Sequence, residues 1–426
     1  MPTQLPPQVS SGPLGSLRLA VSANINANYD RNERKQMRLT LLHSTLFAGL
    51  AVLTISPSAP VSINDFQSFP QFNRVFLLDT TPDTSANISI ADLNEDGNLD
   101  ILLVNGRHWP GMSRIFIGDG RGHFITSYDL CETRYRSYSG HLVDIDGDGH
   151  LDVVLSNDTP DPKVVYLNDG TGHFHLGSTF GNANWETRNA SIADLNGDGL
   201  PDIIVANRTN IGAANYFCLN KGKGRFDTDG VAFSHESATT ITPADFNHDG
   251  LIDLAVPNRD GGQSYVYFNG GNATFSDTAR VPFGPPDARI RMAEVADLDG
   301  DGCFDIVYID EERGVFICFG KKDGTFSPSF EIADGKVTPY ALAVSDLKSD
   351  GKIDIVVGHV EAPSTIYFND GSGHHYSPIQ FGDAMGTVYG FAIADLDKDG
   401  LLDIAVARSG APSVVYFADS QRSKAR

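Results

Sequence analysis

The sequence is poor in positive charge and in long helical patterns, and both shortages exclude classes of protein. Lys and Arg together number 32 against 54 Asp and Glu in 426 residues, which gives a formal net charge of −22. A surface this acidic does not favour wrapping nucleic acid or lying on an anionic membrane, whereas it suits bound cations. Short Val, Ile, Leu and Phe runs separated by turns rich in the 43 Gly indicate many short strands.

Cysteine is also scarce, and its spacing excludes a zinc site. The four cysteines, Cys131, Cys218, Cys303 and Cys318, form no CxxC pair and have no His partner at zinc spacing. Cys303 and Cys318 fall within one repeat and could pair, but we expect buried free thiols. Cysteine usage therefore does not identify the compartment.

The N-terminal region indicates export. Three basic residues precede an uncharged stretch over 39–63, and small residues follow its apolar centre. This pattern predicts a signal peptide over 37–58 with cleavage near Ser58, and the alternative is an uncleaved membrane anchor. Residues 1–36 are either a disordered tail or a mis-assigned start. Both interpretations predict a secreted, periplasmic or cell-surface protein.

A nonapeptide repeats seven times along the chain at intervals of 49 to 52 residues. Each copy lies between two apolar runs, and a third run leads to a Gly-rich turn such as Asn168-Asp169-Gly170 before a fourth. Four antiparallel strands every ~40–50 residues are the signature of a propeller blade. The sequence therefore predicts an all-β, seven-bladed β-propeller over 64–420, followed by a basic tail at 421–426. The nonapeptides begin at Asp92, Asp144, Asp194, Asp245, Asp297, Asp346 and Asp395.

The two ends of the repeat region complement each other. The last repeat stops after its third strand at 413–417, and an unassigned strand at 74–79 precedes the first nonapeptide. We expect this N-terminal strand to complete the seventh blade and close the ring, which removes two exposed edges. A linear β-solenoid is the alternative, but it would not require such complementary ends.

The nonapeptide has the pattern D-x-[DN]-x-D-G-x-x-D, whose oxygen atoms suit a hard cation. Side chains at positions 1, 3, 5 and 9 and the carbonyl at position 7 can surround one calcium ion, while Gly at position 6 permits the bend. An EF-hand needs a Glu at position 12, where this chain has an apolar strand residue, so that interpretation fails. The predicted calcium ligands are Asp92, Asn94, Asp96, Asn98, Asp100, Asp144, Asp146, Asp148, His150, Asp152, Asp194, Asn196, Asp198, Leu200, Asp202, Asp245, Asn247, Asp249, Leu251, Asp253, Asp297, Asp299, Asp301, Cys303, Asp305, Asp395, Asp397, Asp399, Leu401 and Asp403.

The sixth nonapeptide departs from the pattern because Lys348 occupies position 3. An ammonium group cannot ligate a cation and repels one at short range. Either Lys348 swings outward and leaves a poorer site, or its ammonium lies among the aspartates as an internal counter-ion, and we favour the second. We therefore expect six calcium ions, and at most seven. The residues of this weak or empty site are Asp346, Asp350, Lys352 and Asp354.

These repeated acidic loops resemble those of the FG-GAP/VCBS repeat family. The resemblance covers roughly Phe72 to Phe417, and its motif matches without exception in six repeats. Blades of this kind are similar to those of the integrin α-subunit head and of a calcium-containing mushroom lectin. The resemblance implies a secreted or surface propeller. It does not imply one activity, because the family includes adhesion modules, lectins and enzymes.

Strand alternation places the acidic loops and the Gly-rich turns on one face of the ring. The opposite face carries the loops after each second strand and the crossovers between blades. These segments are rich in Arg and aromatic residues, which suits sugar stacking and anionic groups. Alternatively, the arginines only bridge neighbouring blades. The candidate ligand-binding residues are Trp109, Arg136, Tyr138, Trp185, Arg188, Arg291 and Tyr389.

Together, these features favour an exported, calcium-stabilised binding or adhesion module for carbohydrate or a surface protein. The alternative is a polysaccharide-active enzyme of the lyase or dehydratase type, with its site on the face opposite the calcium loops. His108, Tyr138, His359 and Tyr389 are candidate acids or bases for that chemistry. No known catalytic motif is present, so we assign no catalytic residue. We expect no nucleic-acid partner and no membrane contact beyond the possible N-terminal anchor.

Overall fold

A computed structural model describes residues 69–208 and 214–419, and these residues form only strands and loops. The predicted leader at 37–58, the segment before it and the basic tail at 421–426 lie outside the described residues. No helix within the two described ranges is long and apolar enough to cross a membrane. All four cysteines are free, and three of them are buried.

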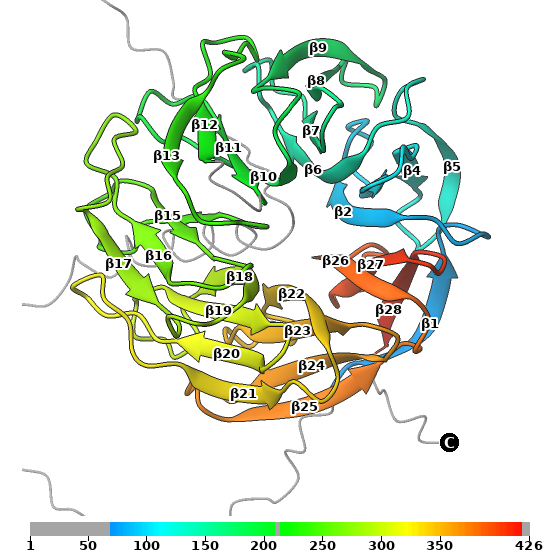
Figure 1. The fold of residues 1–426 in the computed structure, drawn as a ribbon. Helices are drawn as coiled ribbons and strands as arrows, with labels where there is room; N and C mark the ends of the chain where they lie inside the picture. The colour runs from blue at the N-terminus through cyan, green and yellow to red at the C-terminus, as the bar shows by residue number, and fades with distance from the viewer. Residues whose placement is uncertain (1–68, 209–213, 420–426) are drawn as a thin grey trace, which may run out of the picture.

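The strands form seven four-stranded antiparallel sheets, arranged as blades around one axis (Figure 1). This confirms the predicted fold. The innermost strands of blades 1 to 7 are β2 (Ser85–Ala91), β6 (Ser137–Val143), β10 (Thr187–Ala193), β14 (Thr242–Ala244), β18 (Ile290–Ala296), β22 (Pro339–Ser345) and β26 (Thr387–Ala394). The second strands are β3 (Asp100–Asn105), β7 (Asp152–Asn157), β11 (Asp202–Asn207), β15 (Asp253–Val256), β19 (Asp305–Asp310), β23 (Asp354–His359) and β27 (Asp403–Ser409).

The outer half of each blade completes the sheet. The third strands are β4 (Arg114–Gly118), β8 (Lys163–Asn168), β12 (Asn215–Cys218), β16 (Ser264–Tyr267), β20 (Gly314–Cys318), β24 (Ser364–Asn369) and β28 (Val414–Asp419). The outermost strands are β5 (Phe124–Asp129), β9 (Phe174–Phe180), β13 (Val231–Ser234), β17 (Arg280–Phe283), β21 (Phe330–Asp334), β25 (Tyr376–Phe381) and, in blade 7, β1 (Gln71–Leu77).

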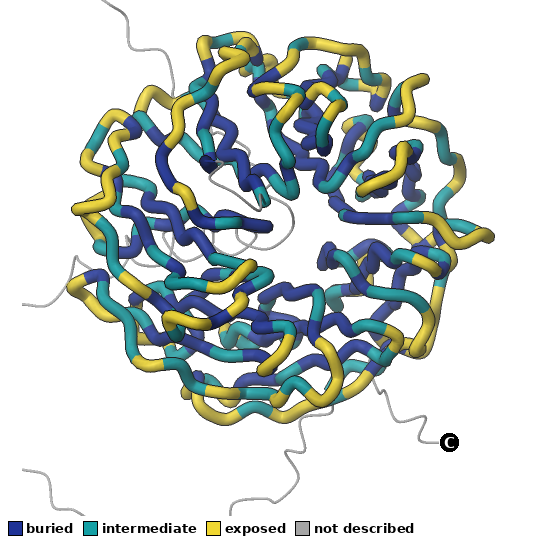
Figure 2. Tube along the Cα trace, viewed as in Figure 1, coloured by how far each residue is buried: buried dark blue, intermediate teal, exposed yellow. Residues whose placement is uncertain are grey.

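The hydrophobic core is divided among the seven blade interfaces. Each of seven buried clusters joins side chains of two adjacent blades, as where Leu102 and Val104 of blade 1 meet Leu142 and Leu155 of blade 2. The second strands are buried on both sides, which explains their continuous apolar runs. The outermost strands are largely exposed at the rim (Figure 2).

The N-terminal strand closes the ring, as predicted. β1 pairs antiparallel with β28, with Val75 opposite Tyr416, and it begins and ends slightly before the predicted strand at 74–79. Phe72 packs into the cluster between blades 6 and 7, and Leu78 packs into the cluster between blades 7 and 1. The closing segment therefore stabilises two blade interfaces.

We predict that Phe72→Ala destabilises the ring much more than Val75→Ala in the same strand. Phe72 is 9% exposed and its ring lies 5.4 Å from that of Phe381, whereas Val75 is 48% exposed. Truncating a buried Phe costs about 3–5 kcal/mol, while an exposed change costs roughly 0.5 kcal/mol or less. Urea denaturation measures both. Equal losses for the two variants would show that β1 is not anchored through its buried side.

Candidate functional site

Each nonapeptide forms the loop between the innermost and the second strand of its blade, and we call these the acidic loops. In the third loop, Asp194 at position 1 accepts hydrogen bonds from the backbone N–H groups of Gly197 and Gly199, both at 2.8 Å. Gly199 at position 6 has a φ of 83°, which favours glycine. The position 2 residue, Leu195, is 1% exposed and anchors the loop in the core.

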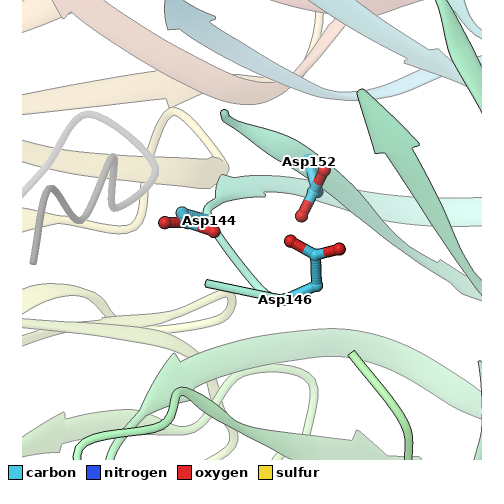
Figure 3. A group of neighbouring side chains, drawn as sticks. All are labelled: Asp144, Asp146 and Asp152. Carbon is cyan, nitrogen blue, oxygen red and sulfur yellow. The ribbon is translucent and has the colours of Figure 1, made fainter. Parts of the chain in front are cut away.

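Carboxylates converge in several of these loops. Oxygen atoms of Asp144, Asp146 and Asp152 all lie within 4.8 Å of one another (Figure 3). The same spacing occurs among three carboxylates of the fifth loop and three of the seventh. Charges this close repel unless a cation is shared, and an all-oxygen donor set fits a hard divalent cation.

The aspartate at position 9 has a structural role that the sequence did not predict. Asp202 is fully buried, and its two oxygens accept hydrogen bonds from the N–H groups of Leu195 at 3.0 Å and Asn220 at 2.8 Å. Burial raises its pKa to about 6. All seven position 9 aspartates are 0% exposed. This residue therefore fastens the acidic loop to the end of the third strand.

The Gly-rich turns connect adjacent acidic loops, which confirms that both lie on one face. The Asn168 side chain donates to the carbonyl of Leu151 in its own blade at 3.0 Å and to that of Leu93 in the preceding blade at 2.8 Å. Equivalent bonds to two loops come from Asn220, Asn269 and Asn369. The acidic face is thus tied together across blade boundaries.

The sixth acidic loop contains its own cation. The Lys348 ammonium lies 3.0 Å from Asp350 Oδ2 and 3.4 Å from the Asn369 carbonyl, and its side chain is only 11% exposed. In the other six loops the position 9 Oδ2 accepts the position 2 N–H. Here the Leu347 N–H bonds to Ser345 instead, and the buried Oδ2 of Asp354 has no hydrogen-bond partner. The Lys348 ammonium therefore points into the loop and pairs with the Asp350 carboxylate, while its replacement of a calcium ion there stays a prediction.

We predict that Asp202→Asn destabilises the protein even in a chelating buffer, unlike Asp198→Asn in the same loop. An Asn at 202 cannot accept both buried N–H groups, a loss of about 1–3 kcal/mol. Asp198 is exposed, and it accepts hydrogen bonds from the Leu200 N–H and from the side-chain amide of Asn196 on the same loop, neither of which is buried. Thermal melts in excess chelator measure the difference. If both variants melt like the parent there, the position 9 carboxylate acts only through metal.

On the opposite face, the predicted residue Trp109 stands on a braced loop after β3. Its side chain is 62% exposed. The N–H groups of Arg107 and Gly111 donate to the carbonyls of Ser137 at 2.9 Å and Tyr135 at 2.8 Å. A Cβ atom at Gly106 would lie 2.5 Å from the Ser137 nitrogen, so only glycine permits this close approach. The loop therefore presents an exposed indole from a fixed backbone.

Predicted residues Tyr138 and Arg188 meet beside this loop. The Tyr138 hydroxyl lies 3.0 Å from His108 Nε2, and the Arg188 guanidinium lies 4.8 Å from the centre of the Tyr138 ring. Arg188 also forms an ion pair with Asp158 at 2.7 Å. Burial and the Arg188 charge lower the pKa of His108, and burial raises that of Tyr138.

Predicted residues Arg291 and Tyr389 meet on the other side of the ring. The Tyr389 and Tyr340 hydroxyls lie 3.0 Å apart, and the Arg291 guanidinium lies 3.3 Å from the centre of the Tyr340 ring. The Arg107 guanidinium lies 3.8 Å from the centre of the Tyr389 ring. Glu311 pairs with Arg291 at 2.9 Å and with Arg259 at 2.7 Å.

These contacts link all seven blades, and we call the set the Arg/Tyr belt. It surrounds the axis at the end of the innermost strands opposite the acidic loops. Its members, in contact order from blade 3 to blade 4, are Arg188, Tyr138, His108, Arg107, Tyr389, Tyr340, Arg291 and Arg259, with Asp158 and Glu311 as acidic partners.

Besides Trp109, two predicted residues lie outside the belt. Trp185 stacks on Tyr216 with ring centres 4.0 Å apart, and Arg136 pairs with Asp161 at 3.1 Å. The belt members Arg107, Tyr340 and Arg259 and both acidic partners were absent from the predicted ligand set. The spacing to the nonapeptide could have predicted one of these residues, Tyr340. It lies six residues before the first residue of a nonapeptide, as do the predicted residues Tyr138, Arg188, Arg291 and Tyr389.

An open cavity of about 620 Å³ lies between the outer strands of blades 5 and 6. Ile332, Val337, Tyr367, Ile379 and His359 are among the residues that line it. The sequence did not predict this cavity, because it forms where two repeats face each other. This cavity is the second candidate ligand site, beside the face that carries Trp109.

The geometry defines a β-propeller with acidic loops on one face. A family model for the FG-GAP-like repeat matches residues 92–155, 144–205, 194–256, 245–308, 297–357 and 346–406. The chain belongs to this family.

Solved structures share the fold at low identity. A lectin of Agrocybe aegerita that recognises non-reducing terminal N-acetylglucosamine is 19% identical with a TM-score of 0.52, covering 78% of this chain and 87% of that one. BBS1N, solved in complex with ARL6DN, is 10% identical with a TM-score of 0.53, covering 82% and 96%. A comparison with curated proteins gave no match.

Proposed function

We propose that this protein is an exported, calcium-stabilised binding module that recognises carbohydrate on the face opposite the acidic loops. The observation that carries the proposal is the Trp109 loop, which holds a 62% exposed indole on a braced backbone beside the Arg/Tyr belt. The predicted leader at 37–58 supports export. The existence of a lectin with the same fold shows that such a ring is compatible with glycan binding.

The chemistry of the Trp109 face suits a sugar. An exposed indole offers a flat apolar surface to the C–H face of a sugar ring, and neighbouring Arg and Tyr groups supply hydrogen-bond donors. Because hydrogen bonds to the crossover before β6 fix the loop backbone, little conformational entropy is lost when a ligand binds.

Calcium has a structural role in this proposal. The acidic loops would hold the ion through their Asp and Asn oxygens and the position 7 carbonyl, and the ion would neutralise carboxylates that otherwise repel. Every loop lies between two strands of one blade, and Asn168, Asn220, Asn269 and Asn369 each bridge two neighbouring loops. Binding only to the folded ring stabilises it by RT ln(1 + [L]/Kd) per site. Chelation should therefore lower the melting temperature.

We predict that the protein binds six calcium ions and that Lys348→Asp raises the count to seven. The substitution removes the internal ammonium and restores the oxygen ligand at position 3. Lys398→Asp is the matched control, because it places an acid at the exposed, non-ligating position 4 of the seventh loop. Metal analysis after gel filtration gives the counts. Seven tightly bound ions in the unmodified protein would contradict the internal counter-ion.

We predict that Trp109→Ala weakens glycan binding about 10–100-fold, the loss expected for a stacked aromatic anchor. The melting temperature should barely change because the side chain is exposed. Glycan-array screening followed by calorimetry measures the effect. Tyr367→Ala is the control for the alternative cavity. If Tyr367→Ala weakens glycan binding and Trp109→Ala does not, the glycan binds in the cavity between blades 5 and 6 and the proposed site is wrong.

The second candidate function is a polysaccharide lyase or dehydratase. The contact that favours it is the hydrogen bond between His108 and Tyr138, because the lowered pKa of His108 leaves a neutral imidazole available as a base. The same glycan experiment separates the two functions. A binding module returns its ligand unchanged, whereas a lyase produces unsaturated products that absorb ultraviolet light.

A further inference from the structure

The Arg/Tyr belt has an excess of positive charge in a strongly acidic protein. Arg188 pairs with Asp158, while Arg259 and Arg291 share the single carboxylate of Glu311. Arg107 has no acidic partner among residues 69–208 and 214–419; it donates to Ser409 Oγ at 2.8 Å, and its Nε is buried without a hydrogen-bond partner. Four arginines thus face two carboxylates, whereas the whole chain carries −22.

Arg107 and Arg291 lie against the same pair of tyrosines, Tyr340 and Tyr389. Arg291 shares its carboxylate partner, Glu311, with Arg259. Arg107 covers Tyr389 at 3.8 Å, and Arg291 covers Tyr340 at 3.3 Å while lying 5.6 Å from the Tyr389 ring. The two hydroxyls, 3.0 Å apart, use one hydrogen between them, which leaves the other for a ligand. Burial raises the pKa of Tyr340, but Arg291 and the Tyr389 hydrogen bond lower it more, so the net pKa falls.

The backbone holds Arg107 in this place at an energetic cost. Its φ is 69°, a left-handed conformation that is uncommon outside glycine. Such conformations are energetically unfavourable and persist where surrounding contacts fix them, often at binding sites. The N–H of Arg107 bonds to the Ser137 carbonyl at 2.9 Å, and the N–H of Gly106 bonds to the Thr84 carbonyl at 3.0 Å. The backbone is therefore fixed two residues before Trp109, and the guanidinium is held by the Tyr389 ring and Ser409 Oγ.

We propose that the belt between Arg107 and Arg291 binds the anionic group, carboxylate or sulfate, of a glycan whose sugar ring stacks on Trp109. This inference rests on the proposed carbohydrate function and makes it specific for acidic glycans. Arg107 supplies its positive charge and its unpartnered Nε–H, and a tyrosine hydroxyl donates its remaining hydrogen. Hydrogen bonds to a charged group are shorter and stronger than those between neutral groups, so this site should favour an anion over its neutral ester.

The test compares three probes of equal length by calorimetry: an oligogalacturonate, its methyl ester and a sulfated galactose oligosaccharide. We expect at least one acidic probe to bind about tenfold or more tighter than the ester, a preference that shrinks as salt rises. Arg107→Gln should remove the preference while the ester still binds. Arg121→Gln is the matched control, because it removes the same charge from an exposed turn of blade 1 on the acidic face.

The outcomes separate this inference from the proposed function. Tighter binding of the oligogalacturonate than of the ester assigns the site to carboxylate, and tighter binding of the sulfated oligosaccharide assigns it to sulfate. If ester and acids bind equally and all depend on Trp109, glycan binding stands and the anion site is wrong. If Arg107→Gln weakens acid and ester equally with an unchanged melting temperature, the arginine only positions the loop and the anion site is also wrong. If no glycan binds, both proposals fail.

Discussion

The ring depends on one buried carboxylate in each blade. The aspartate at position 9, Asp202 in blade 3, accepts hydrogen bonds from two backbone N–H groups in a site fully removed from water. It joins the loop after the innermost strand to the end of the third strand. Burial of a charge is unfavourable, as its raised pKa of about 6 shows. A cation in the loop would offset both this burial and the repulsion from neighbouring carboxylates.

The sixth loop carries a positive charge of its own. Lys348 places an ammonium where the other loops have an Asp or Asn oxygen, and this ammonium forms an ion pair with Asp350. The seventh loop has a related contact, because Arg74 of the closing strand β1 forms an ion pair with Asp397. The positive charges of Lys348 and Arg74 therefore pair with carboxylates of the acidic loops. On the opposite face, positive charge is concentrated in the Arg/Tyr belt. The two faces have separate chemistry.

Much of the fold could be predicted from the sequence because the repeat is regular. Seven nonapeptides at a nearly constant period define the blades, and the incomplete seventh repeat identifies the closing strand. The acidic loops could also be predicted, because all the proposed ligands of one loop lie within nine consecutive residues. Contacts between repeats could not. The bridge from Asn168 to Leu93 and the contact of Arg107 with Tyr389 join residues of different blades, whose proximity arises only in the folded ring. The hydrogen bonds of Asp202 lie within one blade, and they were missed because the pattern assigned this carboxylate to calcium alone.

The central claim is that the folded ring is completed by cations in its acidic loops. The most direct measurement is the free energy of unfolding as a function of free calcium concentration at constant ionic strength. If the claim holds, unfolding releases the bound ions, and at saturating calcium the slope against ln[Ca²⁺] should approach about six times RT. A free energy of unfolding that does not change with calcium would contradict it.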